Sequence, residues 1–256
     1  MIKESSKFTD GLIFEGMTSI SAVINSPSSN DRKISKIIYD QSKEKSKHKE
    51  LAFLRHKSAE LGFDLFPASS DDINSLTIGN SHGGIIAVCE ERSIPYLDQS
   101  QIKSDGFYVM LEGIEDPYNF GYSLRSLYAA GADGIILNER NWMGAAGVVA
   151  RASAGASEML DMFISSGEDA VKVFKESNYK VICAGIRDSV SIYDADMKKP
   201  IFLIIGGEKR GISASVLKHA DQIVRIDYDS KFRGSLSAAS SAAIIGFEIM
   251  HQNKIM

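Results

Sequence analysis

Three short stretches combine residue types that bind ligands and guide protons, and each follows an apolar run. Residues 112–119 supply carboxylates and an amide, and Arg125 lies six residues further on. Residues 206–211 read GGEKRG, and residues 226–237 read IDYDSKFRGSLS. Glycines let a ligand approach the backbone closely, and a guanidinium can hold phosphate or hydroxyl oxygens. The three stretches therefore predict a site that binds a polar ligand next to an arginine.

The elements around these stretches must bring them together. From residue 107 onward strand patterns alternate with helix patterns, which predicts an α/β fold with a mainly parallel sheet and helices on both faces. Ligands bind beyond the carboxyl ends of the strands in such sheets. The expected strands are 107–111, 134–137, 180–184, 201–205 and 223–226, and the expected helices are 145–152, 169–177, 213–219 and 235–251.

Composition narrows the class of protein. Of 256 residues 44% are hydrophobic and 24% are charged, which is normal for a soluble chain able to bury a core. Cys89 and Cys183 lie in apolar runs without further cysteines or histidines nearby, so we expect reduced core thiols and no metal site. We also expect a cytoplasmic protein without a targeting or membrane segment, since the sequence has no long apolar run. The net charge of −4 permits a local basic face.

Residues 1–92 have the pattern of a separate small α/β module, and residues 93–105 lose apolar periodicity and form the expected linker. Within the module, residues 43–61 have helical spacing and an excess of basic side chains. One interpretation is a solvated helix face, and the other is a face that contacts RNA phosphates. The basic residues are Lys43, Lys45, Lys47, Lys49, Arg55 and Lys57.

Other ligand classes fit the motifs poorly. The GGEKRG stretch is neither the dinucleotide-binding GxGxxG nor the phosphate-binding GxxxxGK[ST] motif. The sequence has no GxSxG elbow, and His219 and His251 lie near helix ends, so a serine hydrolase is not supported.

Taken together, the stretches resemble the motifs of the SpoU (TrmH-like) RNA ribose 2′-O-methyltransferases of the SPOUT superfamily. Residues 116–125, DPYNFGYSLR, are similar to the first motif, DPxNxGxxxR. Residues 204–212, IIGGEKRGI, are similar to the second, and Gly234-Ser235-Leu236-Ser237 before a long helix is similar to the third. Residues 152–156, ASAGA, resemble a weaker signature between them. The N-terminal module resembles the ribosomal-protein-L30e-like RNA-binding domain.

This resemblance implies a SPOUT domain at residues 106–256 whose parallel sheet carries a deep trefoil knot, an exception to the rule that chains avoid knots. It also implies a homodimer, S-adenosylmethionine as cofactor, and RNA as substrate, with 23S rRNA favoured over tRNA. The cofactor would contact Gly206, Ile226, Leu236 and Ser237, with main-chain groups near the first three against its adenosine part. The positions that match the family's catalytic residues are Asn119, Arg125, Glu208 and Ser235.

Two positions depart from the family pattern. Ser237 stands where the third motif has asparagine, and Asp227-Tyr228 stands where proline and methionine are usual. Serine is shorter than asparagine and lacks the paired donor and acceptor of an amide. Alternatives therefore stay open: an RNA-binding protein of the same fold without catalysis, or a small-molecule α/β enzyme. For Arg125 the alternative is a surface ion pair with Glu112 or Asp116.

Overall fold

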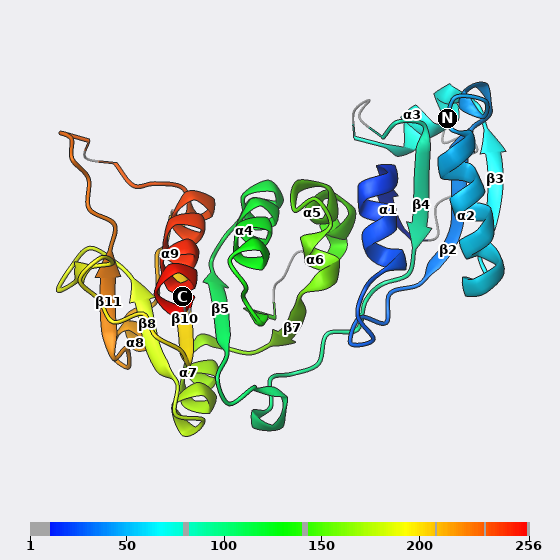
Figure 1. Cartoon of the computed structure of the whole chain (residues 1–256). Helices are drawn as coiled ribbons and strands as arrows, with labels where there is room; N and C mark the ends of the chain where they lie inside the picture. Colours follow the sequence, from blue (N-terminus) through cyan, green and yellow to red (C-terminus); the bar gives the residue numbers. More distant parts are fainter. Residues whose placement is uncertain (1–10, 79–81, 140–142, 208, 233, 255–256) are drawn as a thin grey trace, which may run out of the picture. The chain divides into compact units, whose positions relative to one another are not determined.

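The computed structural model describes residues 11–78, 82–139, 143–207, 209–232 and 234–254. The chain forms two compact units (Figure 1). The described residues of 1–93 and 142–159 make the first unit, and those of 94–141 and 160–256 make the second. Among the helices in these ranges, none is both long and apolar enough to cross a membrane.

The first unit is built on a four-stranded sheet. Its strands lie in the order β1 (Leu12–Glu15), β4 (Ile85–Cys89), β2 (Ile34–Asp40) and β3 (Asp64–Ala68). Only β2 and β3 are parallel neighbours. The helices of residues 11–78 are α1 (Gly16–Ile24), α2 (His48–Leu61) and α3 (Ser70–Leu76). The helix expected at 43–61 thus begins at His48, because Gln41–Lys43 forms a separate 3-10 turn capped by Asp40.

Residues 142–159 belong to this unit by their contacts, whereas the sequence analysis assigned them to the C-terminal domain. Helix α5 (Ala146–Ala152) packs on β1 and α1, and α6 (Ala156–Met159) also contacts α1. A Cβ at Gly147 would lie 1.8 Å from the carbonyl oxygen of Ile13, so the backbones meet where glycine has no side chain. Below them the buried Arg32 donates to Glu158 at 2.9 Å. Contacts between residues far apart in sequence leave no local pattern, so the boundary was not readable from the sequence.

The second unit holds a seven-stranded sheet. The order is β7 (Asp161–Ile164), β6 (Gly134–Leu137), β5 (Phe107–Glu112), β10 (Ile201–Gly206), β8 (Lys180–Ala184), β11 (Gln222–Arg225) and β9 (Val190–Ser191). All of these neighbours pair in parallel, as the sequence analysis predicted. The run of buried residues in β5 and β10 reflects a sheet covered on both faces.

Alternate side chains of the strands face different helices. Tyr108, Phe202 and Val181 join one core with α7 (Gly167–Glu176) and α8 (Ala214–Leu217). Helices α4 (Pro117–Ala129) and α9 (Ala238–Asn253) pack on each other, and α9 contacts β10. The strands β7 and β9 were not among the expected strands, since β7 has four residues and β9 has two, too few to give a clear strand pattern.

The three polar stretches meet at the carboxyl edge of this sheet. β5 and β10 are paired in register up to Gly206 and Glu112, so the loops that follow them start side by side. The loop after β11 begins two strands away and leads to α9 (Figure 1). The trefoil knot stays a prediction, because strand order and register describe pairing and not threading.

Candidate functional site

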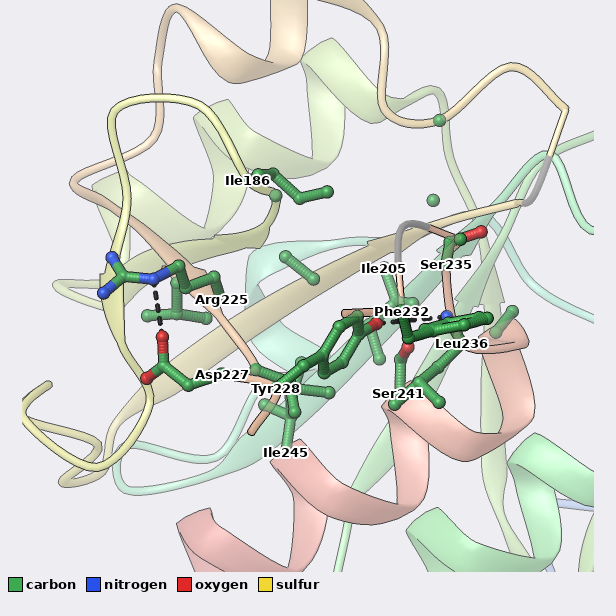
Figure 2. A pocket seen from close by; sticks show the side chains of 18 of the residues that line it. Ile186, Ile205, Arg225, Asp227, Tyr228, Phe232, Ser235, Leu236, Ser241 and Ile245 are labelled. Atoms are coloured by element: carbon green, nitrogen blue, oxygen red, sulfur yellow. Dashed lines mark hydrogen bonds and ion pairs between the residues drawn. The ribbon is translucent and has the colours of Figure 1, made fainter. Parts of the chain in front are cut away.

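A pocket of about 590 Å³ opens at the carboxyl ends of β8, β10 and β11 and is closed by the first turns of α9 (Figure 2). Its apolar walls include Ile205 at the end of β10 and Ile245 of α9. Gly185 and Ile186 supply a further wall in the loop after β8. Pockets of this size accept a ligand such as a nucleoside derivative. The arrangement matches the place where parallel sheets bind ligands.

Glycine is required at two positions on the floor of this pocket. A Cβ at Gly206 would lie 2.5 Å from the carbonyl carbon of Gly211, and one at Gly207 would lie 2.1 Å from the carbonyl oxygen of Gly113. Both collisions are with backbone, which cannot move aside as a side chain can. The amide of Gly207 donates to the carbonyl of Glu112 at 2.6 Å and fixes this loop to the end of β5. Gly206, Gly207 and Gly211 therefore lie where backbone segments pack tightly against one another.

Three of the four residues predicted to hold the cofactor line the pocket. They are Gly206, Ile226 and Leu236, and the predicted catalytic residue Ser235 lies beside them. The fourth, Ser237, is not among the lining residues. Its hydroxyl accepts a hydrogen bond from the amide of Ser240 at 3.1 Å and caps the N-terminus of α9. Because of this cap, α9 begins at Ala238 and not at the expected residue 235.

Asn119 lines a smaller neighbouring pocket of about 280 Å³ together with Asp116 and Lys209. Gly207 and Ala238 line both this pocket and the larger one. Asp116 caps α4 by accepting from the amides of Tyr118 and Asn119. The two pockets therefore share a wall, and the first motif lies next to the second and third.

Arg125 lies on the exposed side of α4 and lines neither of these two pockets. Within the described ranges, its guanidinium makes no hydrogen bond or ion pair. The carboxylates considered as partners are engaged elsewhere: Asp116 caps α4, and Glu112 accepts from the amide of Ser213 at 3.4 Å. The surface ion pair is thus not found in this part of the chain. Glu208, the remaining predicted catalytic residue, lies outside the described residues.

The comparison with protein families decides which group these motifs represent. A family model described as the SpoU rRNA Methylase family matches residues 106–247. The chain belongs to the SpoU rRNA Methylase family. The match confirms the family that the motifs resemble.

Relatives of this SpoU family member match about two thirds of its length. An uncharacterized tRNA/rRNA methyltransferase of Synechocystis is 29% identical over 190 residues, 70% of this chain but only 48% of that protein. The 23S rRNA (guanosine-2′-O-)-methyltransferase RlmB of Shewanella oneidensis is 28% identical over 178 residues, 68% of this chain and 72% of that protein. The chain thus spans about half the length of the first of these relatives.

A solved structure confirms the fold of the SpoU family member. The AdoMet-bound rRNA methyltransferase of Sinorhizobium meliloti superposes with a TM-score of 0.76 at 23% identity, over 94% of this chain and 87% of that one. At 23% identity this similarity shows the fold alone, an α/β fold with a parallel sheet.

The basic segment of residues 43–61, which includes α2, is largely neutralised in this SpoU family member. Three of its basic side chains pair with acids of the same segment: Lys47 with Glu50 at 2.8 Å, Lys57 with Glu60 at 2.6 Å, and Arg55 with Glu44 at 2.8 Å. The hydrogen bond from Lys47 holds the pKa of Glu50 below its ordinary value, and that from Lys57 does the same to the pKa of Glu60. Lys43 lies 3.7 Å from the buried Asp40. Lys45 and Lys49 have no ion pair with a described residue, so they are the cations most available to phosphates.

Sequence reasoning missed several lining residues. Ile186, Phe232 and Ser241 carry no motif and come to the pocket only through the strand order and the fold of the last loop. Asp227 lines the pocket, and a hydrogen bond from the Ser191 side chain keeps its pKa below the ordinary value. Its Oδ1 also accepts from Nε of Arg225 at 2.7 Å. The glycine directly after β8 was the available sign of a close approach there.

Within the residues that the structure describes, no group of three or more histidine, cysteine, aspartate or glutamate side chains could hold a metal ion. Both cysteines are buried, and burial raises the pKa of each thiol to about 12. Neither thiol can therefore act as a nucleophile at neutral pH.

Proposed function

We propose that this chain transfers a methyl group from S-adenosylmethionine to the 2′-hydroxyl of a ribose in structured RNA, with 23S rRNA as the favoured substrate. The observation that carries the proposal is the pocket in which Gly206 of the second polar stretch meets Ile226 and Leu236 of the third. Family membership and the AdoMet bound to the Sinorhizobium meliloti protein support the cofactor. The RlmB name of the Shewanella protein supports the ribose and the 23S rRNA.

The residues of the pocket suit the cofactor. Glycines on the floor leave backbone groups uncovered, and Ile205, Ile226 and Ile245 offer an apolar surface for a purine. The neighbouring polar pocket holds Asn119 close to the shared wall at Gly207. When bound, S-adenosylmethionine supplies an electrophilic methyl group.

The remaining work falls to side chains that orient the ribose and guide its proton. Ser235 lies at the larger pocket and Asn119 at the smaller one, so they can hold the hydroxyl from two sides. An arginine keeps its proton in proteins and cannot be a base unaided. We therefore assign to Arg125 the orientation of the hydroxyl and a neighbouring phosphate, with the phosphate as the route for the proton. Glu208 stays a proposed catalytic residue, on the resemblance of the second motif alone.

A homodimer is part of the proposal. Tyr122 and Tyr128 of α4 and Phe247 of α9 are large side chains left 43 to 49% exposed on helices that pack together. Arg125 lies between the two tyrosines at helical spacing. A second copy of the chain would cover this apolar surface and bring Arg125 into an enclosed site.

Because the proposed substrate is ribosomal RNA, we also propose that the protein acts in the cytoplasm.

One observation favours the alternative of an RNA-binding protein without catalysis. Ser237 takes the place of the motif's asparagine, and its hydroxyl is used as a helix cap. The alternative predicts RNA binding without methyl transfer.

The test is calorimetric titration with S-adenosylmethionine, followed by transfer of its labelled methyl group to 23S rRNA fragments and to tRNA. We expect cofactor binding and preferential labelling of 23S rRNA. Binding of RNA by a protein that takes up no cofactor would support the alternative. Preferential labelling of tRNA would keep the reaction and reject the substrate.

A further inference from the structure

The loop after β11 lays two aromatic rings across the pocket. Tyr228 and Phe232 both line it, with ring centroids 5.7 Å apart and planes inclined by 52°. Figure 2 shows the two rings side by side between the end of β11 and the start of α9. Tyr228 is 39% exposed and Phe232 55%, so neither ring is part of a packed core. Large exposed rings at the mouth of a pocket are suited to stack on a flat ligand.

The hydroxyl of Tyr228 is bonded to the pocket wall. It accepts a hydrogen bond from the amide of Leu236 at 3.2 Å. Leu236 is also the residue whose main chain is proposed to contact the nucleoside part of the cofactor. A single N–H makes one strong hydrogen bond, so the tyrosine hydroxyl and an acceptor nitrogen of a purine compete for it. A nucleoside can use this amide only after Tyr228 has released it.

The contacts around the two rings leave Tyr228 room to release the Leu236 amide, but they hold the base of the loop in place. A Cβ at Gly234 would lie 2.6 Å from Cζ of Phe232, so the ring lies directly against the backbone before Ser235. At the β11 end of the loop, immediately before Tyr228, Nε of Arg225 donates a hydrogen bond to Oδ1 of Asp227. Arg225 also donates to the carbonyl of Ser189. The base of the loop is thus fixed, and the part that carries the rings is exposed.

From these contacts we propose that Tyr228 is a gate of the nucleoside pocket. In the free protein its hydroxyl occupies the Leu236 amide, and in the complex the purine takes this amide while the Tyr228 ring covers the purine face beside Phe232. This inference rests on the proposed cofactor and adds a residue that replaces the family's usual methionine.

Two variants separate the hydroxyl from the ring. Tyr228→Phe removes the competing acceptor and keeps the ring, so S-adenosylmethionine should bind about two- to ten-fold more tightly, through faster association. Tyr228→Ala also removes the stacking surface, so it should bind about ten-fold or more weakly than Tyr228→Phe. Adenosine alone should show the same order. Calorimetry gives the affinities and stopped-flow mixing gives the association rates.

Tyr193→Phe is the matched control, because Tyr193 is 64% exposed in the same unit and is absent from the residues that line the pocket. It should bind like wild type, and thermal unfolding of all variants should show that they fold. Equal affinities and rates for wild type, Tyr228→Phe and Tyr228→Ala would overturn the gate and leave the proposed function in place. A wild type that binds no S-adenosylmethionine at all would overturn both.

Discussion

The guanidinium of Arg125 is exposed on α4 and has no hydrogen-bond or ion-pair partner among the described residues. The motif that contains it could be recognised from the sequence, as could Gly206 and Ser235, because each is tied to neighbours a few residues away. Ile186 carries no such pattern. Its place at the pocket depends on β8 lying between β10 and β11, which only the assembled sheet defines.

Arg125→Lys tests whether the arginine acts in the reaction. Lysine keeps the charge but loses the planar fork that can hold a hydroxyl and a phosphate together. We expect methyl transfer to fall by about two to four orders of magnitude while cofactor affinity stays near that of wild type. Single-turnover methylation by the folded, dimeric variant measures this. Equal rates for lysine and arginine would remove Arg125 from the mechanism.

Gly206→Ala tests the close approach of backbones at the pocket floor. The added methyl group would meet the backbone of Gly211, so the loop must shift and the cofactor affinity should fall by about ten-fold or more, given the usual cost of overpacking. Gly144→Ala is the control, because no atom lies within 4 Å of the added Cβ. Titration with S-adenosylmethionine compares the two. Wild-type affinity in Gly206→Ala would show that this loop does not shape the pocket.

At the scale of elements, the strands and helices of the second unit were largely predictable, because buried parallel strands are continuous apolar runs. The residues at which the helices begin were harder to predict. Helix α9 begins three residues later than expected since Ser237 acts as its cap, and α2 begins five residues later since a 3-10 turn precedes it. Polar side chains that bond to nearby amides decide such boundaries, and the same residues can be read as ligands.

Substitutions at Ser237 separate its role as a cap from a role at the cofactor. Ser237→Ala should lower the free energy of unfolding by about 0.5 to 2 kcal/mol, because the amide of Ser240 loses its acceptor. Ser237→Asn restores the family residue and should retain the stability, since asparagine caps helices as well as serine does. Urea denaturation gives the stabilities. Unchanged stability in Ser237→Ala would contradict the capping role.

The basic segment of residues 43–61, which includes α2, can be tested with its own paired lysines as a control. If Lys45 and Lys49 contact phosphates, replacing both by alanine should weaken RNA binding and reduce the salt slope by about 0.7 to 0.9 per lost contact. Replacing Lys47 and Lys57, which are bonded to Glu50 and Glu60, should have a smaller effect. Binding curves over a range of salt concentrations measure both pairs. Identical slopes for the two variants would return α2 to a solvated face.

At the scale of the whole molecule, the sequence indicated two parts, and the fold has two compact units. Residues 142–159 differ, since they pack with the first unit through the buried Arg32 and Glu158 pair. A buried ion pair is costly to break, so this segment is firmly held there. Neither Arg32 nor Glu158 belongs to a motif from which this ion pair could have been predicted. The division at 93–105 and the knot remain predictions drawn from composition and from the family.

The position of the transferred methyl group tests the account most directly. The wild-type protein is incubated with S-adenosylmethionine and unmodified 23S rRNA, and the RNA is digested to nucleosides and analysed by mass spectrometry. The account predicts a single new nucleoside with its methyl group on the ribose 2′-oxygen, and its loss with Arg125→Lys. A methyl group on a base, or no transfer to ribosomal or transfer RNA by a protein that binds the RNA, would contradict it.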